Sequence, residues 1–245
     1  MNINYESVKR IKSLKQSIES ATGKTYSDLT SAIQGLKDSG LKIDNFVKDG
    51  ADLGDVTLSN NVRNLRSGAF ARCYVGNITL SESISSIPRY AFYRTNFRSG
   101  TTVFLPNSLR TIEPESFMEA DMSSIILPEG VTSIGESAFA YCFLRDITIP
   151  SSVTEIGDYA FAHNTQLENA TIDGTDLQMG SDIFAVCSNL TTITFVGGTP
   201  ISIEQGAFVN CNKLTTINVP WSEGEVAGAP WYATKATINY NYTGG

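Results

Sequence analysis

The chain has 245 residues, of which 41% are hydrophobic and 18% charged, a composition typical of a folded protein with a buried core. Its net charge of −7 argues against nucleic-acid binding, because neutralising phosphates requires an excess of Lys and Arg. We expect no membrane insertion, because no stretch approaches the roughly 18 apolar residues that span a bilayer. The polar, basic start also lacks the apolar core of a secretory signal.

Residues 1–50 are predicted to form a small helical module, for attachment or capping, followed by a linker. Their apolar residues recur at helical spacing in two runs, which Gly23 separates. Helices this short are marginal alone, so we expect them to dock on another surface. That surface is either the first of the following repeats or a partner, including a second copy of the chain in a homo-oligomer. The residues expected to make the contact are Val8, Ile11, Leu14, Ile18, Leu29, Ile33 and Leu36.

A repeat of 22 to 25 residues fills residues 51–220, and its best-formed unit reads L-x-x-I-x-I-P-x-x-V-x-x-I-G-x-x-A-F-x-x-C/N. A period near 23 fits the rung of a leucine-rich repeat. Each rung supplies one short parallel strand with alternate residues inward, and the rungs must stack to bury their apolar sides. We therefore predict an α/β-type repeat solenoid of about seven repeats, with short parallel strands on its concave face. Its anchor residues are Phe70, Phe92, Phe117, Phe139, Phe161, Phe184 and Phe208.

Two units depart from this pattern. The unit between Phe92 and Phe117 carries three extra residues around "NFRSGTT", which predicts a bulging loop. The segment 173–184, "DGTDLQMGSDIF", lacks the Ile-Gly signature, which predicts an irregular convex side.

Residues 221–245 are predicted to close the C-terminal end of the stack. Trp221, Trp231 and Tyr232 are suited to covering the last rung, because a repeat protein needs a cap over its exposed core. The string "ATINY" at 236–240 can add one terminal strand.

No catalytic, metal or cofactor site is expected. Four cysteines lie three residues after a repeat Phe, in a slot that also holds Asn, Thr and Ala, so they are interpreted as small buried fillers. Cys187 and Cys211 occupy neighbouring rungs, and they form the one pair that could bond. His163 lies two residues after its Phe in a slot of variable chemistry, which is typical of a surface position. No two cysteines have the spacing of metal ligands.

The outward positions of the predicted strands remain as a candidate binding surface. They are dominated by hydroxyls and amides, which has a purely structural explanation, since Thr favours strands on a solvated face. The functional alternative is a flat polar groove for a carbohydrate or a protein. The candidate residues are Arg145, Asp146, Thr148, Glu168, Asn169, Thr171, Thr191, Thr192, Thr194, Thr215, Thr216 and Asn218.

The repeat units "TSIGESAFAYCFLRDITIP" and "TEIGDYAFAHNTQLENATI" resemble the BspA-like leucine-rich repeats, over about residues 54–220. The segment "IKSLKQSIESATGKTYSDLTSAIQGL" resembles a helical module of tail and other virion-surface proteins of phages that infect Firmicutes. The end, "VPWSEGEVAGAPWYATKATINYNYTGG", is similar to the closing segment of BspA-like proteins of phages and gut bacteria.

These resemblances imply a non-enzymatic structural protein of a phage virion, in the tail or a surface fibre. Its N-terminal helices would bind other virion proteins, and its repeats would bind a glycan or protein of the bacterial surface. The alternative is an adhesin at a bacterial cell surface or in the extracellular space, which binds a host protein or glycan.

Overall fold

The computed structural model describes residues 50–58, 60–174, 177–197, 203–204, 206–225 and 229–243. The chain divides into two compact units, Met1–Lys48 and Asp49–Gly245, and the described residues belong to the second. The helical hairpin predicted from Val8 to Leu36 lies outside the described residues.

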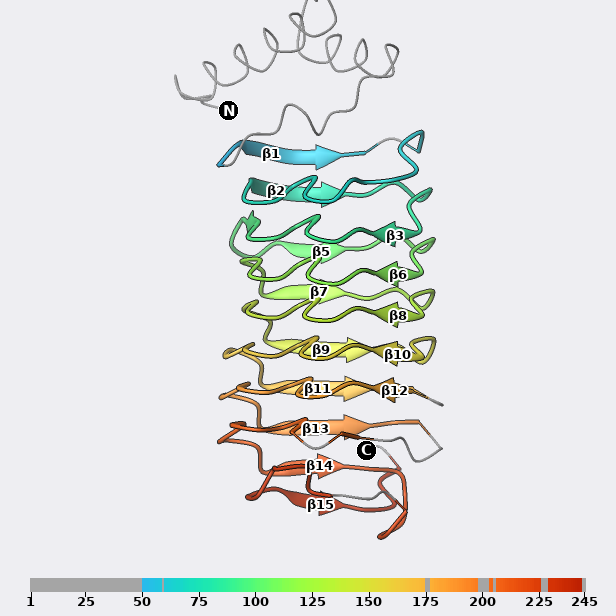
Figure 1. The fold of residues 1–245 in the computed structure, drawn as a ribbon, viewed down its shortest axis with the longest axis vertical. Helices are drawn as coiled ribbons and strands as arrows, with labels where there is room; N and C mark the ends of the chain where they lie inside the picture. Colours follow the sequence, from blue (N-terminus) through green and yellow to red (C-terminus); the bar gives the residue numbers. More distant parts are fainter. Residues whose placement is uncertain are drawn as a thin grey trace, which may run out of the picture. The chain divides into compact units, whose positions relative to one another are not determined.

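The second unit is a parallel β-solenoid of the leucine-rich repeat type, which confirms the predicted fold. One strand from each rung lies in a common column (Figure 1). Alternate residues of the strands, such as Ile147 and Ile149, are buried in the interior. We call the outward side of this column the strand face. Its strands are β1 (Asp52–Thr57), β2 (Tyr74–Thr79), β5 (Thr102–Phe104), β7 (Ser124–Ile126), β9 (Asp146–Ile149), β11 (Asn169–Ile172), β13 (Thr192–Phe195), β14 (Thr216–Asn218) and β15 (Thr237–Asn239).

A second parallel sheet lies beside the first and was not predicted as a sheet (Figure 1). Each rung contributes two residues, of which the second is buried: Ile87, Ile112, Ile134, Ile156 or Met179. The Val/Ile pair of the repeat thus packs into the interior from the side opposite its strand. The strands are β3 (Ser86–Ile87), β6 (Thr111–Ile112), β8 (Ser133–Ile134), β10 (Glu155–Ile156) and β12 (Gln178–Met179).

The prediction of an irregular rung at 173–184 was wrong. Within its described residues, β12 pairs in register with β10, so that Gln178 lies opposite Glu155 and Met179 opposite Ile156. Met179 fills the interior slot of an Ile, because an unbranched thioether adapts to the space that its neighbours leave.

In three of these rungs a glycine follows the buried residue (Gly135, Gly157 and Gly180), and the close approach of neighbouring rungs requires it. A Cβ atom built on Gly157 would lie 2.5 Å from the backbone nitrogen of Glu136. Gly135 and Gly180 meet the rung before them just as closely, at 2.5 Å from the Pro114 nitrogen and 2.6 Å from the Asp158 nitrogen. The Ile-Gly signature therefore marks the place where successive rungs pack backbone to backbone.

The repeat unit between Phe92 and Phe117, which has three extra residues, contains an additional short strand and a turn. Strand β4 (Asn96–Phe97) pairs with β2, and Phe97 is buried. The chain then turns at Gly100, whose φ of 82° lies in the left-handed region, before it enters β5. The predicted loop is thus partly ordered as an additional strand.

An interior column of seven stacked rings runs the length of the solenoid. Successive rings from Phe70 to Phe208 lie 4.8–6.1 Å apart between centroids, with interplanar angles of 6–20°. The column ends on Trp231, whose ring meets Phe208 edge-on at 6.2 Å. Trp221 and Trp231 are buried and β15 adds the terminal strand, as predicted, whereas Tyr232 is 58% exposed and does not cover the last rung.

Candidate binding surface

Each aromatic turn, the segment around a Phe of the interior column, places two residues in the left-handed region. The residue two positions after the Phe has φ between 54° and 62° in all seven rungs. The residue two positions before the Phe has φ between 52° and 92°, and it is glycine at Gly68 and Gly206. These two positions turn the chain around the ring and direct their own side chains outward. Decoration of this edge is therefore independent of the interior.

The cysteine slot, three residues after the Phe, is a hydrogen-bonding position and not only a filler. Its side chain donates a hydrogen bond to the carbonyl oxygen of the Phe in the preceding rung. The donors and their distances to that oxygen are Thr95 Oγ1 to Phe70 (2.7 Å), Cys142 Sγ to Phe117 (3.1 Å), Asn164 Nδ2 to Phe139 (2.8 Å), Cys187 Sγ to Phe161 (3.3 Å) and Cys211 Sγ to Phe184 (3.0 Å).

These buried thiols are unsuited to nucleophilic chemistry. Burial raises the pKa of Cys211 to about 12, and it raises the pKa values of Cys142 and Cys187 further. A thiolate is the reactive form, so each remains a protonated donor at neutral pH. Cys187 and Cys211 are both free thiols, so the one pairing that the sequence left open is not formed.

His163 lies on the surface of its turn, where it stacks on Tyr141 of the preceding rung at 4.1 Å between centroids. Tyr141 is 46% exposed, so the pair forms a small aromatic step on the outside of the solenoid. Among the described residues, no group of three or more His, Cys, Asp or Glu side chains could hold a metal ion.

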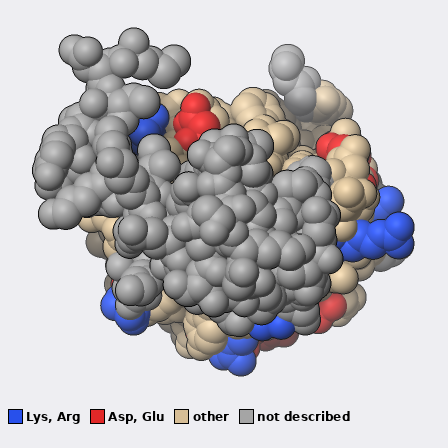
Figure 2. All heavy atoms as spheres, turned by 90° about the horizontal axis from the view of Figure 1, so that it is seen from above, with Lys and Arg blue, Asp and Glu red and all other residues tan. Residues whose placement is uncertain are grey.

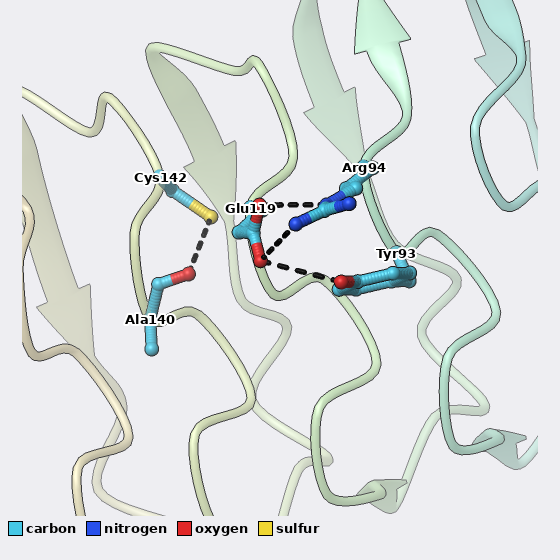
Figure 3. A network of polar contacts seen from close by, with 5 residues as sticks. All are labelled: Tyr93, Arg94, Glu119, Ala140 and Cys142. Carbon is cyan, nitrogen blue, oxygen red and sulfur yellow. Dashed lines mark hydrogen bonds and ion pairs between the residues drawn. The ribbon is translucent and has the colours of Figure 1, made fainter.

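The N-terminal rungs carry arginines that acids of the next rung already engage. Glu119 accepts from Arg94 Nε at 2.7 Å and from Arg94 Nη2 at 3.1 Å, and the Tyr93 hydroxyl donates to the same carboxylate at 3.3 Å (Figure 3). The hydrogen bond with Glu119 raises the pKa of Arg94. Arg89 forms an ion pair with Glu115 in the same manner. These pairs are exposed and contribute little to stability, but they occupy the guanidinium groups.

Charge is distributed unevenly along the solenoid. Residues 50–130 contain seven Arg and eight acidic residues, whereas residues 131–245 contain three basic and eleven acidic residues. Seen from above, basic and acidic side chains both appear along the visible rim of the described residues (Figure 2). This distribution disfavours polyanionic ligands, most strongly over the C-terminal rungs.

The structure brings the predicted strand-face residues together in three rows that run across the strands. Arg145, Glu168, Thr191 and Thr215 lie one step before the strands, and their backbones are joined in succession by hydrogen bonds from 2.7 to 3.1 Å. Two further rows follow the register of β9, β11, β13 and β14. The first comprises Asp146, Asn169, Thr192 and Thr216, and the second comprises Thr148, Thr171, Thr194 and Asn218.

Exposure divides these candidates. Arg145, Asp146, Thr148, Glu168, Asn169 and Thr215 are exposed, while Thr171, Thr191, Thr192, Thr194 and Thr216 are half-buried. Asn218 is only 7% exposed, so it is not an accessible contact. Its amide nitrogen donates to Thr194 Oγ1 at 3.1 Å, and its amide oxygen accepts from Asn239 Nδ2 at 2.8 Å. Asn218 therefore holds the last strands together.

The sequence interpretation did not single out an apolar region of the same face. Phe104 is 60% exposed and Ile126 52% exposed, and the two are register partners on β5 and β7. We call this pair the apolar platform. A sequence signal for it exists: the strings "VFL" at 103–105 and "IIL" at 125–127 lack a polar residue at the outward position.

These features define the class: a parallel β-solenoid whose one broad exposed sheet face varies along its length while the interior repeats. Comparison with protein families agrees, because the BspA type leucine-rich repeat region matches residues 41–167 and 110–227 in six copies. The chain belongs to this family. No helix among the described residues is long and apolar enough to cross a membrane.

Solved structures that are similar to this chain include two leucine-rich repeat proteins. A leucine-rich repeat protein from Bacteroides ovatus shares 14% identity, with a TM-score of 0.31 over 76% of this chain and 83% of the other. A leucine-rich cell surface protein from Faecalibacterium prausnitzii shares 18% identity, with a TM-score of 0.32 over 80% of this chain and 86% of the other. No curated protein matches the sequence.

Proposed function

We propose that this chain is a non-enzymatic adhesion protein of a bacterial surface, which binds a host glycan or protein through its strand face. The observation that carries the proposal is the strand face itself, where the described strands present polar side chains in register beside the apolar platform. Such a face offers a broad contact area on a rigid scaffold, which suits recognition of an extended partner.

The chemistry of the described residues supports binding over catalysis. The buried thiols of Cys142 and Cys187 are protonated, and the ring of His163 stacks on Tyr141 instead of facing a thiol or hydroxyl nucleophile. A general base needs a reacting group within hydrogen-bond reach, and on the strand face the Asp146 carboxylate instead accepts a hydrogen bond from the side-chain amide of Asn169 at 2.9 Å.

A second placement, in a phage virion, is supported by the resemblance of the two end segments to phage proteins. The N-terminal helices would then bind other virion proteins. The two placements differ in where the protein is found, so antibody detection in purified phage particles and in the cell-envelope fraction of the source organism separates them. Detection in particles favours the virion, and detection in the envelope favours the adhesin.

Adhesion is tested with the fluorescently labelled full chain on intact epithelial and bacterial cells. We expect saturable binding that Thr148→Arg weakens, because a long charged side chain would project from the middle of the strand face. Glu155→Arg on the second sheet is the matched control, since Glu155 is exposed on a different face and should leave binding unchanged. Equal binding by both variants would contradict the strand face as the contact, and absence of saturable binding to all cells would contradict adhesion.

A further inference from the structure

The apolar platform is unusual for its position. Phe104 has Ile126 as register partner on one side and Thr79 on the other, so two large apolar side chains adjoin at the surface of the strand face. Isolated exposed apolar side chains are common on proteins, whereas adjoining ones within a polar rim mark a contact site. The interior already has its own residues at these strands, Val103 and Ile125, so the platform is not part of the core.

A polar cluster lies beside the platform, one row earlier on the neighbouring strands. The Asp55 carboxylate accepts a hydrogen bond from the Asn77 backbone nitrogen at 2.8 Å, and the Asn77 side-chain nitrogen lies 3.4 Å from the same oxygen. Arg98 Nη1 lies 3.9 Å from that oxygen and forms an exposed ion pair. The cluster thus presents an amide, a carboxylate and a guanidinium whose charges cancel.

Gly76 allows this cluster to form. A Cβ atom at Gly76 would lie 2.2 Å from Asp55 Oδ1, so any side chain there would displace the carboxylate. The carboxylate therefore lies across β2, against the backbone of the next rung. The three extra residues between Phe92 and Phe117 also help to form the cluster, because they precede β5 and hold Arg98 within reach of Asp55.

The spacing between platform and cluster suits one sugar ring. Neighbouring strands lie about 4.8 Å apart, and two residues along a strand span about 7 Å, so Phe104 and Asn77 are separated by roughly the width of a pyranose. A pyranose has an apolar C–H face that packs on an aromatic ring and a rim of hydroxyls that bond to carboxylates and amides. Asp55, Asn77 and Thr79 offer acceptors and donors of this kind.

We propose that Phe104, Ile126, Thr79, Asn77, Asp55 and Arg98 form a subsite for a hexose unit of a neutral glycan. The sugar ring stacks on Phe104, and its hydroxyls bond to Asp55 and Asn77. The ion pair of Arg98 with Asp55 leaves the subsite without net charge, which favours a neutral glycan over a charged one. This inference rests on the proposed function and assigns its contact to β1, β2, β5 and β7, whereas the sequence candidates lie on β9 to β14.

A protein partner fits these residues less well. Binding energy between proteins concentrates in buried Trp, Tyr and Arg side chains that fill pockets. The platform consists of one exposed Phe and one exposed Ile, and Arg98 of the adjoining cluster is paired with Asp55.

The test is native affinity electrophoresis of the full chain in gels that contain soluble mannan, galactan or mixed-linkage β-glucan. Heparin and polygalacturonate serve as charged comparators. We expect retardation by at least one neutral glycan, with the dissociation constant raised about tenfold by Phe104→Ala and kept by Phe104→Trp. Gln178→Ala, a neutral substitution of an exposed residue on β12 of the second sheet, is the control and should bind as the unsubstituted chain does.

The outcomes separate this inference from the proposed function. Neutral-glycan binding that Phe104→Ala leaves unchanged would overturn the subsite, while adhesion through another part of the strand face would stand. Retardation by heparin or polygalacturonate alone would also overturn the neutral-glycan subsite and leave adhesion standing. Cell binding that protease treatment of the cells abolishes, with no glycan retarding the chain, would lead to the same conclusion. No retardation together with no cell binding would overturn both.

Discussion

The interior column and the strand face follow opposite rules, although the same rungs build both. Along the interior, seven successive rungs place the same Phe ring in the same slot, within 6.1 Å of the next. Along the strand face, corresponding positions change from Phe104 to Ile126, Thr148 and Thr171 in four successive rungs. The stack tolerates this change because outward side chains make no contribution to the interior packing.

This difference teaches where to look for function in a repeat protein. A feature that recurs in every rung is explained by stacking, because each rung must meet its neighbour in the same way. A feature that departs from the repeat and has no packing role requires another explanation. The apolar platform and the Asp55 cluster are departures of this kind, whereas the cysteines, which first resemble a reactive set, belong to the repeat.

Removing one ring from the interior column should lower the stability of the solenoid more than any change on the strand face. Phe161 is fully buried, and its ring lies 5.3 Å from Phe139 and 5.5 Å from Phe184. We expect Phe161→Ala to lower the free energy of unfolding by about 3–5 kcal/mol, measured by urea denaturation followed by circular dichroism. Phe104→Ala is the matched control, because Phe104 is 60% exposed and its loss should change stability by less than about 0.5 kcal/mol. Similar shifts for both variants would contradict the division between interior and face.

The donor slot should be the next most sensitive position. Asn164 donates to the carbonyl oxygens of Phe139 at 2.8 Å and Phe161 at 2.9 Å, and it accepts from the Leu144 nitrogen at 3.3 Å. Asn164→Ala removes this partner from the Phe139 carbonyl and from the Leu144 nitrogen, while the Phe161 carbonyl keeps the Cys187 thiol as a donor. We therefore expect a loss of about 2–3 kcal/mol in the free energy of unfolding.

Asn164→Cys separates donation from size in the same slot. Other rungs use Cys there as the donor, so the thiol should recover part of the stability that the alanine variant loses. A cysteine variant as unstable as the alanine variant in the same denaturation assay would show that this slot only needs to be filled.

The interior was predictable because its signal repeats, and each missed feature has a physical reason. The donor role of the Cys/Asn/Thr slot was hidden because Ala120 shares it, which left small size as the common property. The second sheet was missed because two-residue strands are too short to show a period of two. The regular rung around Met179 was missed because Met replaces Ile without a change in packing.

The strand face was predictable only in outline. The alternation of β-branched residues identified the outward positions, and the structure places the predicted candidates in rows there. Sequence alone did not show that Asn218 is covered by its neighbours, because this depends on Asn239 of the terminal strand. It also did not bring Asp55, Asn77 and Arg98 together, since they come from three different rungs.

A buried residue that departs from the repeat and makes no hydrogen bond should be replaceable with a gain in stability. Ser116 takes the place that Ala occupies in five rungs, and its fully buried hydroxyl has no hydrogen-bond partner among the described residues. We expect Ser116→Ala to raise the free energy of unfolding by about 1–2 kcal/mol, because it removes a desolvated polar group. Ser152→Ala should have the opposite sign, since the Ser152 hydroxyl donates to the Val131 carbonyl at 2.7 Å. A fall in melting temperature for both variants would contradict the interpretation of Ser116.

The smallest expected effect lies in the aromatic turns, where the left-handed backbone conformation is the same in every rung but the residue type varies. Val186 has a φ of 62°, a conformation that a β-branched residue adopts at a cost and that Asn tolerates. Asn210 occupies the same position in the next rung with a φ of 60°. We expect Val186→Asn to stabilise the chain by about 0.5–1 kcal/mol and Asn210→Val to destabilise it by a similar amount. Thermal melts of the two variants should therefore shift in opposite directions. Shifts of the same sign would mean that side-chain contacts, and not the left-handed backbone, decide which residues this position accepts.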